Sequence, residues 1–256
     1  MTQFATFHDL KDKSVFITGG GSGIGAALTD GFLSQEARVG FVQRSDATEF
    51  VSRMAGAHGT APVFRSCDIS DPVALQRSMD DIAEENGVFD IVINNAANDT
   101  RHRLEDFSAE DWDACMDVNL RPHFLTAQRA ASGMRAKGHG SIINFSSISY
   151  MMGNAGYPAY ATSNAAITGL TRSLARELGP DGIRVNALVP GWVLTQRQLD
   201  LWADPEALAA HLDKQCLKEH LKEADIVGGA LFLASDISRM MTGQVLVIDG
   251  GVVTTG

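Results

Sequence analysis

Short runs of β-branched and other apolar residues alternate along this chain with longer segments of helical periodicity. Seven such runs stand out, at residues 14–18, 38–42, 62–65, 90–93, 141–146, 183–188 and 245–248. Because they are almost continuously apolar, they are typical of strands covered on both faces of a parallel sheet. The helical segments lie at residues 26–34, 72–86, 112–137, 159–178 and 224–235. This alternation predicts a doubly wound α/β fold with a seven-stranded parallel sheet.

The segment over residues 191–223 interrupts the alternation, because it holds Trp192 and Trp202 and no run of strand type. No Pro-, Gly- or Ser-rich linker divides the 256 residues, a length that one large α/β domain accommodates. Insertions this long in a compact domain usually have a function. We therefore expect a single domain over residues 1–256, with 191–223 as a lid over a substrate.

Composition excludes several classes of partner. The chain has 21 basic and 31 acidic residues, a net charge of −10, and no basic cluster, which argues against nucleic acid and anionic lipid. The 3 cysteines are widely spaced and form neither a disulfide framework nor a metal motif. No leader pattern opens the sequence, and no stretch approaches the ~18 apolar residues of a membrane span. We expect a cytoplasmic protein without a metal site.

A glycine-rich turn, TGGGSGIG at residues 18–25, follows the first expected strand and precedes a helix. Glycines let the backbone approach a pyrophosphate closely, and the helix N-terminus offers it amide groups. No Lys-Ser/Thr pair follows as in a P-loop, which argues against a nucleoside triphosphatase. A turn that binds nothing is the alternative, but its context favours a dinucleotide. The expected contacts are Gly19, Gly21, Ser22, Gly23, Ile24 and Gly25.

The end of the second expected strand bears on the choice of cofactor. An acidic residue there usually accepts hydrogen bonds from the adenosine ribose of NAD, whereas an arginine accommodates the 2′-phosphate of NADP. This chain has Gln43, Arg44 and Ser45, which favours NADP. Asp46 follows directly and Arg44 could be solvated, so NAD remains open.

Further motifs follow in order: Cys67-Asp68-Ile69, Asn94-Asn95-Ala96-Ala97, Asn119, Ser147, Tyr160, Pro190-Gly191, Thr242-Gly243 and Asp249-Gly250-Gly251. Together with the glycine turn, they resemble the short-chain dehydrogenase/reductase family over essentially the whole chain. The resemblance implies a Rossmann-type fold, an enzyme that uses NADP or NAD, and a homotetramer. Its subunits would meet through the helices expected at 112–137 and 159–178.

The residue types suit hydride transfer, because a proton must move at the oxygen of the carbon that gains or loses the hydride. The phenol of Tyr160 can move that proton if its pKa is lowered towards the working pH. The hydroxyl of Ser147 can hold the substrate oxygen near the phenol. The resemblance assigns Asn119 to a kink and a bound water in the preceding helix.

The same resemblance supplies further cofactor contacts. It places Asp68 at the adenine, Asn95 near the ribose and Thr195 at the carboxamide. Neighbouring positions complete the expected cofactor site: Ile69, Ala96, Ala97, Pro190, Gly191 and Val193.

One position departs from the family. A lysine is expected four residues after the tyrosine, where it would bond the nicotinamide ribose and lower the tyrosine pKa, but this chain has Asn164. Asparagine can bond a ribose yet carries no charge, and no lysine lies between Gly140 and Gly182. Three explanations stand: a substitution made to trap a complex, a slow enzyme with an alkaline optimum, or a binding protein without turnover. The intact Ser147 and Asn119 favour an enzyme with one altered residue.

The substrate prediction is a sugar. Residues 98–102, 143–149 and the stretch ending at 216–218 look closest to bacterial dehydrogenases that oxidise an aldose at its anomeric carbon to the lactone, the xylose dehydrogenases among them. A sugar needs several directed hydrogen bonds. The candidate contacts are Asn98, Arg101, His102, Ser149, Met152, Asn154, Trp192 and Gln198. Each of these could instead be a solvent-facing loop residue, and for most of them that interpretation is favoured.

Two alternatives to a sugar dehydrogenase remain open. One is a ketone or oxo-acyl reductase of the same family, and the other is a nucleotide-binding relative without turnover. His102 and His123 are expected to be exposed or capped rather than ligands, because no carboxylate or second histidine stands at metal spacing.

Overall fold

The computed structural model describes residues 4–254, so the ends of the expected domain, 1–3 and 255–256, lie outside the described residues. Seven parallel strands form one sheet in the order β3-β2-β1-β4-β5-β6-β7. The strands are β1 (Ser14–Thr18), β2 (Arg38–Gln43), β3 (Val63–Ser66), β4 (Ile91–Asn94), β5 (Gly140–Phe145), β6 (Ile183–Pro190) and β7 (Val245–Ile248). The predicted seven-stranded, Rossmann-type sheet is confirmed.

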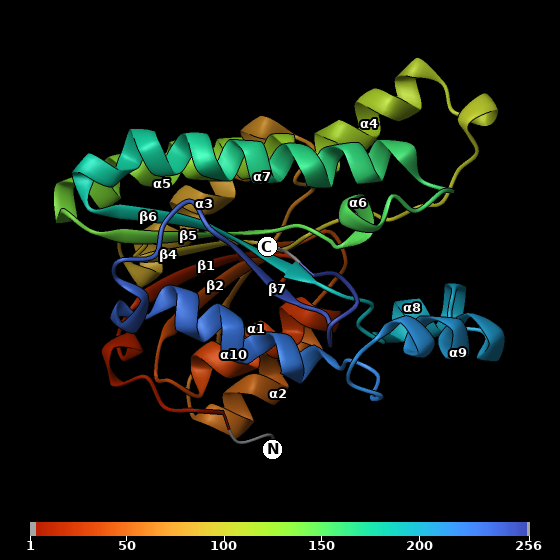
Figure 1. Ribbon diagram of the computed structural model, residues 1–256. Coiled ribbons are helices and arrows are strands. Elements are labelled where there is room, and N and C mark those ends of the chain that lie inside the picture. The colour runs from red at the N-terminus through yellow and green to blue at the C-terminus, as the bar shows by residue number, and fades with distance from the viewer. Residues whose placement is uncertain (1–3, 255–256) are drawn as a thin grey trace.

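Helices cover both faces of the sheet. They are α1 (Gly23–Leu33), α2 (Thr48–His58), α3 (Pro72–Asn86), α4 (Ala109–Asn119), α5 (Arg121–Lys137), α6 (Ser149–Met152), α7 (Pro158–Leu178), α8 (Gln196–Leu201), α9 (Pro205–Lys214) and α10 (Glu223–Ala234). Short 3-10 helices add η1 (His8–Leu10), η2 (Leu104–Asp106), η3 (Gly179–Asp181) and η4 (Asp236–Ser238). In Figure 1, α1, α2 and α10 lie on one face, α3, α5 and α7 on the other, and α8 and α9 project beyond the carboxyl end of β6. No helix within residues 4–254 has the length and apolarity to cross a membrane.

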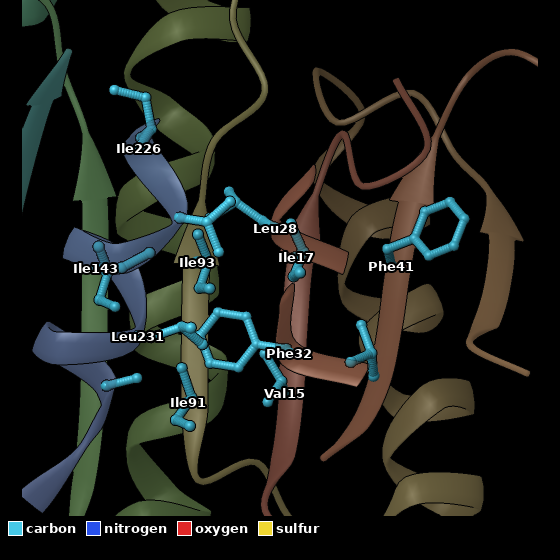
Figure 2. Close-up of a cluster of buried hydrophobic side chains, with 14 of the residues drawn as sticks. Val15, Ile17, Leu28, Phe32, Phe41, Ile91, Ile93, Ile143, Ile226 and Leu231 are labelled. Carbon is cyan, nitrogen blue, oxygen red and sulfur yellow. The ribbon is translucent and has the colours of Figure 1, made fainter. Parts of the chain in front are cut away.

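The core explains the continuous apolar runs. In Figure 2, Leu28 and Phe32 of α1 and Leu231 of α10 pack against alternate strand residues such as Ile17 and Ile93. The intervening strand residues belong to a second buried cluster, on the face covered by α3, α5 and α7; they include Phe16, Val92 and Ile142. Both faces of each central strand are therefore buried, as a parallel sheet requires.

The helix expected over 112–137 is in fact two helices. The chain breaks at Leu120, whose φ of −125° and ψ of −52° are not helical. Pro122 causes the break, because proline lacks an amide donor and its ring clashes with the carbonyl of the preceding turn. It is tolerated as the second residue of α5. The sequence prediction ran through this proline and was wrong there.

Helix α2 was missed altogether. Phe50 and Met54 are buried, and Val51 and Ala55 beside them are half-buried, so apolar residues do recur at helical spacing in α2 and the sequence prediction left this signal out. The segment 191–223 contains no strand, as expected, but it holds the two helices α8 and α9.

Candidate active site

A cavity of about 1130 Å³ opens at the carboxyl ends of the strands. Its wall is formed by the loops that follow β1 to β6 and by residues of α7, α8 and α9. The strand order reverses between β1 and β4, where the connections diverge to opposite faces of the sheet. Such a switch point is where doubly wound sheets bind their ligands.

The glycine turn forms one end of the wall. Gly19 has a φ of +72°, and a Cβ at Gly25 would lie 1.8 Å from the carbonyl oxygen of Gly19, so both positions require glycine. Ser22 precedes α1 without a side-chain cap, which leaves the first amides of the helix open for an anion. Gly21 is not in the wall: it lies against Gln43, whose Oε1 accepts a hydrogen bond from its amide (2.9 Å).

The ends of β2 and β3 meet at one side of the cavity, where the sequence predicts the adenosine. The guanidinium of Arg44 is exposed, with its Nη1 3.9 Å from Oδ2 of Asp68. The amide and hydroxyl of Ser70 donate to Asp68 (2.9 and 2.7 Å), and these bonds hold the pKa of Asp68 below its usual value. Arg44 can therefore reach a phosphate without breaking a close ion pair.

Thr18 and Asn95 join the ends of β1 and β4. Thr18 Oγ1 accepts hydrogen bonds from the amides of Asn95 and Ala96, both at 3.0 Å. Asn95 Nδ2 donates to the carbonyl of Thr18 (3.1 Å). Asn95 lines the cavity, but its side-chain amide is occupied in holding the glycine turn in place.

Ser147 and Tyr160 lie in the wall of the same cavity, on the loop after β5 and in the first turn of α7. Ser147 Oγ accepts a hydrogen bond from the amide of Ser149 (3.1 Å), a contact that does not use the proton of its own hydroxyl. Burial raises the pKa of Tyr160 to about 12, and the negative charge of Asp99 adds to this shift. The polar side chains of Ser147 and Asn164 act in the opposite direction without reversing it.

Asn164 is buried one helical turn after Tyr160. Its Nδ2 donates to the carbonyl oxygen of Tyr160 at 2.8 Å. The principal formal charge that acts on the phenol is thus the negative one of Asp99, where the family lysine would place a positive one.

Asn119 holds the loop that follows β4. Its Oδ1 accepts from the amide of Asn98 (2.7 Å), and its Nδ2 donates to the carbonyl of Asn98 (3.1 Å). Asn119 is the last residue of α4, directly before the break at Leu120. The expected kink therefore lies next to this residue.

Seven of the eight proposed substrate contacts lie in the cavity wall, and His102 does not. They are Asn98, Arg101, Ser149, Met152, Asn154, Trp192 and Gln198. The ring of His102 stacks on Phe107 with 3.7 Å between ring centroids. Its Nε2 accepts from the amide of Ala159 (3.4 Å) and its Nδ1 lies 3.2 Å from the carbonyl of Thr100, so His102 caps the start of α7.

His123 is buried rather than exposed. Its Nε2 donates to the carbonyl oxygen of Phe145 (3.2 Å), and burial lowers the pKa of the ring to about 4. The imidazole is therefore neutral at physiological pH, and it lines the cavity. Within residues 4–254, no three His, Cys, Asp or Glu side chains gather in a way that could hold a metal ion.

The sequence reasoning missed several wall residues, of which Asp99 is the most consequential. Gln198 of α8 donates from Nε2 to Asp99 Oδ2 (2.6 Å), and Arg197 reaches Oδ1 at 3.3 Å. Trp192 Nε1 in turn donates to Gln198 Oε1 (2.9 Å). Asp99 lies beside Asn98 in the loop after a strand, a signal that could have found it. Among the others are Tyr157, Arg197, His211 and Lys214.

The sheet, the glycine turn and the serine and tyrosine in one cavity define the class of nucleotide-dependent oxidoreductases. Residues 19–253 match the family model described as enoyl-(acyl carrier protein) reductase. The chain is 46% identical over 248 residues to a probable galactose dehydrogenase of Rhizobium meliloti, covering 96% of this chain and 97% of the relative. It is 43% identical over 249 residues to a D-xylose 1-dehydrogenase of Caulobacter vibrioides, covering 96% and 98%.

Solved structures agree. A short-chain dehydrogenase/reductase of Serratia marcescens matches with a TM-score of 0.88 and 32% identity, covering 96% of this chain and 99% of that one. A 3-oxoacyl-[acyl-carrier protein] reductase of Brucella melitensis matches with a TM-score of 0.88 and 30% identity, covering 100% and 98%. The chain belongs to the short-chain dehydrogenase/reductase family, whose dehydrogenases use the nicotinamide dinucleotides NAD or NADP. The family prediction is confirmed.

Proposed function

We propose that this chain oxidises an aldose at its anomeric carbon to the lactone, with NADP preferred over NAD. The observation that carries the proposal is the wall beside Tyr160, where amide, hydroxyl and carboxylate side chains converge on one cavity. A polyhydroxy substrate needs that density of directed polar groups. The similarity to dehydrogenases named for galactose and xylose, over 96% of this chain, supports the same substrate class.

The residues present fit a dinucleotide. Only glycine leaves room at Gly25, and the open amides at the start of α1 suit a pyrophosphate. We assign Arg44 to the 2′-phosphate of NADP, Asp68 to the adenine and Thr195 to the carboxamide. The bound nicotinamide would supply the acceptor for the hydride.

Tyr160 takes the proton of the anomeric hydroxyl in this proposal. Ser147 donates a hydrogen bond to the same oxygen and holds it near the phenol. The segment 191–223 acts as the lid that limits the access of water, since α8 and α9 form part of the cavity wall.

Asn164 makes the proton step slow in this proposal. A phenol with a pKa of about 12 is ionised to a fraction of about 10⁻⁵ at pH 7. General-base catalysis by Tyr160 would then become appreciable only at alkaline pH. We also propose a homotetramer, in which Trp112 of α4 and Phe124 of α5, 40% and 47% exposed, lie on the faces covered by other copies.

The test is a substrate panel read by the ultraviolet absorbance of the reduced cofactor. Aldoses are tested with NADP and with NAD, at neutral and alkaline pH. They are expected to reduce the cofactor, and to do so faster at alkaline pH. Half-maximal rates should need a lower concentration of NADP than of NAD. Turnover of ketones with NADPH, and of no aldose, would instead establish the ketone or oxo-acyl reductase. Cofactor binding without turnover of either class, even at alkaline pH, would establish a non-catalytic protein.

A further inference from the structure

The loop after β4 places one carboxylate, that of Asp99, in the cavity wall, where none of the proposed substrate contacts carries a negative charge. Asp99 follows Asn98, which Asn119 holds by both backbone groups, so its position is fixed from the helix behind it. The Asp99 side chain is 27% exposed, and it lines the cavity together with Tyr160. It is thus a partly buried carboxylate, close enough to Tyr160 for its charge to act on the phenol.

Two contacts account for only part of the hydrogen-bonding capacity of Asp99. A carboxylate offers about four acceptor positions. Gln198 takes one on Oδ2 at 2.6 Å, and Arg197 approaches Oδ1 from Nε and Nη2 at 3.4 and 3.3 Å. The contact with Arg197 is long, and its side chain is 54% exposed, so the ion pair is weak. Acceptor positions therefore remain for a third donor in the cavity.

The contact between α8 and position 99 does not by itself require a charged side chain at that position. A neutral amide at position 99 would still accept the hydrogen bond of Gln198, and it would spare Tyr160 the repulsion that disfavours its phenolate. A carboxylate that opposes ionisation of the catalytic phenol needs a compensating role. Charge-assisted acceptance of substrate hydroxyls is such a role, because these bonds are stronger than neutral ones.

We propose that Asp99 determines specificity: its carboxylate accepts hydrogen bonds from hydroxyl groups next to the reacting carbon and so selects polyhydroxy substrates over simple ketones. This inference rests on the proposed sugar oxidation and adds Asp99 to it as the residue that selects the substrate. A ketone without neighbouring hydroxyls buries the carboxylate without supplying a donor. That loss of solvation is costly, whereas a sugar replaces the displaced water with its own hydroxyls.

The ionisable surroundings of Tyr160 allow an independent reading of the Asp99 charge. The groups around the phenol are Asp99 and Tyr157, which both raise its pKa. Arg101 lies over the ring of Tyr157 at 5.9 Å, and Arg197 pairs with Asp99. Removal of the charge at position 99 would therefore lower the pKa of Tyr160, whatever the substrate is.

The experiment compares the parent chain with Asp99→Asn and a matched control, Asp200→Asn. Asp200 lies on α8, accepts a hydrogen bond from Gln196 (2.7 Å) and is absent from the cavity wall. With NADP bound, dissociation constants for D-galactose, D-xylose and cyclohexanone are measured by the tryptophan fluorescence, to which Trp192 in the wall contributes. The tyrosinate absorbance is titrated with alkali in each protein, with Tyr160→Phe subtracted.

Asp99→Asn is expected to weaken the affinity for the sugars by about 10- to 100-fold. It should leave the affinity for the ketone unchanged or tighter, and lower the pH at which Tyr160 ionises. Asp200→Asn should change none of these. Equal sugar affinities in the parent and in Asp99→Asn would overturn the role of Asp99, as would an equal loss for sugars and ketone. If the parent binds the ketone but neither sugar, the proposed function fails first and this inference fails with it.

Discussion

Restoring a cation at position 164 should accelerate turnover at neutral pH. Asn164 is buried one turn from Tyr160, so the ammonium of Asn164→Lys would lie near the phenol. An opposite charge at about 4–6 Å lowers a pKa by about 1–3 units. From a starting pKa of about 12, the phenol would then titrate at about 9–11, and its ionised fraction at pH 7 would rise about 10- to 1000-fold.

The sign follows from the charge, because the ammonium stabilises the phenolate and moves the alkaline rise of kcat/KM to lower pH. The measurement is kcat/KM for D-galactose and D-xylose across the alkaline range, with the Kd of NADP measured in parallel. That Kd should change far less than the rate, since the glycine turn is unaltered. Two controls isolate the charge: Asn164→Gln, which lengthens the side chain without a charge, and Tyr160→Phe in the Asn164→Lys background.

Asn164→Gln should leave the pH profile in place, and Tyr160→Phe should abolish the gain. An unchanged rate and pH profile in Asn164→Lys, with sugar still bound, would refute the reasoning: ionisation of Tyr160 would not limit the reaction. The non-catalytic interpretation would then be preferred. An equal gain from Asn164→Gln would show that side-chain length, rather than charge, is the missing property.

Three further outcomes are expected. Arg44→Asp should reverse the preference for NADP over NAD, by about one to two decades in affinity as measured by calorimetry, and unchanged affinities would remove Arg44 from the cofactor site. Because the folded pKa of His123 is about 4 against 6.5 for the free group, the unfolded chain gains a proton first as the pH falls. The stabilisation is therefore full above pH 6.5 and is lost towards pH 4, by about 3 kcal/mol, and this loss should be absent in His123→Gln when urea unfolding is followed at both ends of that range. Light scattering at micromolar concentration should give the mass of a tetramer, and a monomer would contradict the proposed assembly.

The sheet could be predicted from the sequence because strands that are buried on both faces appear as continuous apolar runs. Residues such as Val92 and Ile93 are both apolar since each faces a different layer of helices. Signals of local chemistry were equally clear at the glycine turn, where only glycine fits at Gly25. Helix α2 carries a comparable pattern, with Phe50, Val51 and Met54 at helical spacing, so its omission was an error of prediction and not the absence of a signal.

The site was less predictable where roles depend on partners distant in sequence. The side chain of Asp99 accepts a hydrogen bond from Gln198, 99 residues further along the chain, and no local sequence pattern predicts that pairing. The sequence did not distinguish His102 from His123, yet His102 caps a helix outside the cavity and His123 is buried in the cavity wall. The two histidines were distinguished only by the packing of α7 and α5.

The alternation of layers along β1 limits how this protein can diverge. Val15 and Ile17 face α1 and α10, Phe16 faces the opposite helices, and the hydroxyl of Thr18 accepts two amides of the neighbouring loop. A single-residue deletion within the strand would exchange the two sets of side chains and turn that hydroxyl away from its donors. Changes of length are thus confined to the connections beyond the strand ends, such as 95–108 and 191–223. Exchanging these loops can therefore change the substrate preference, while the pairing register of the strands stays the same.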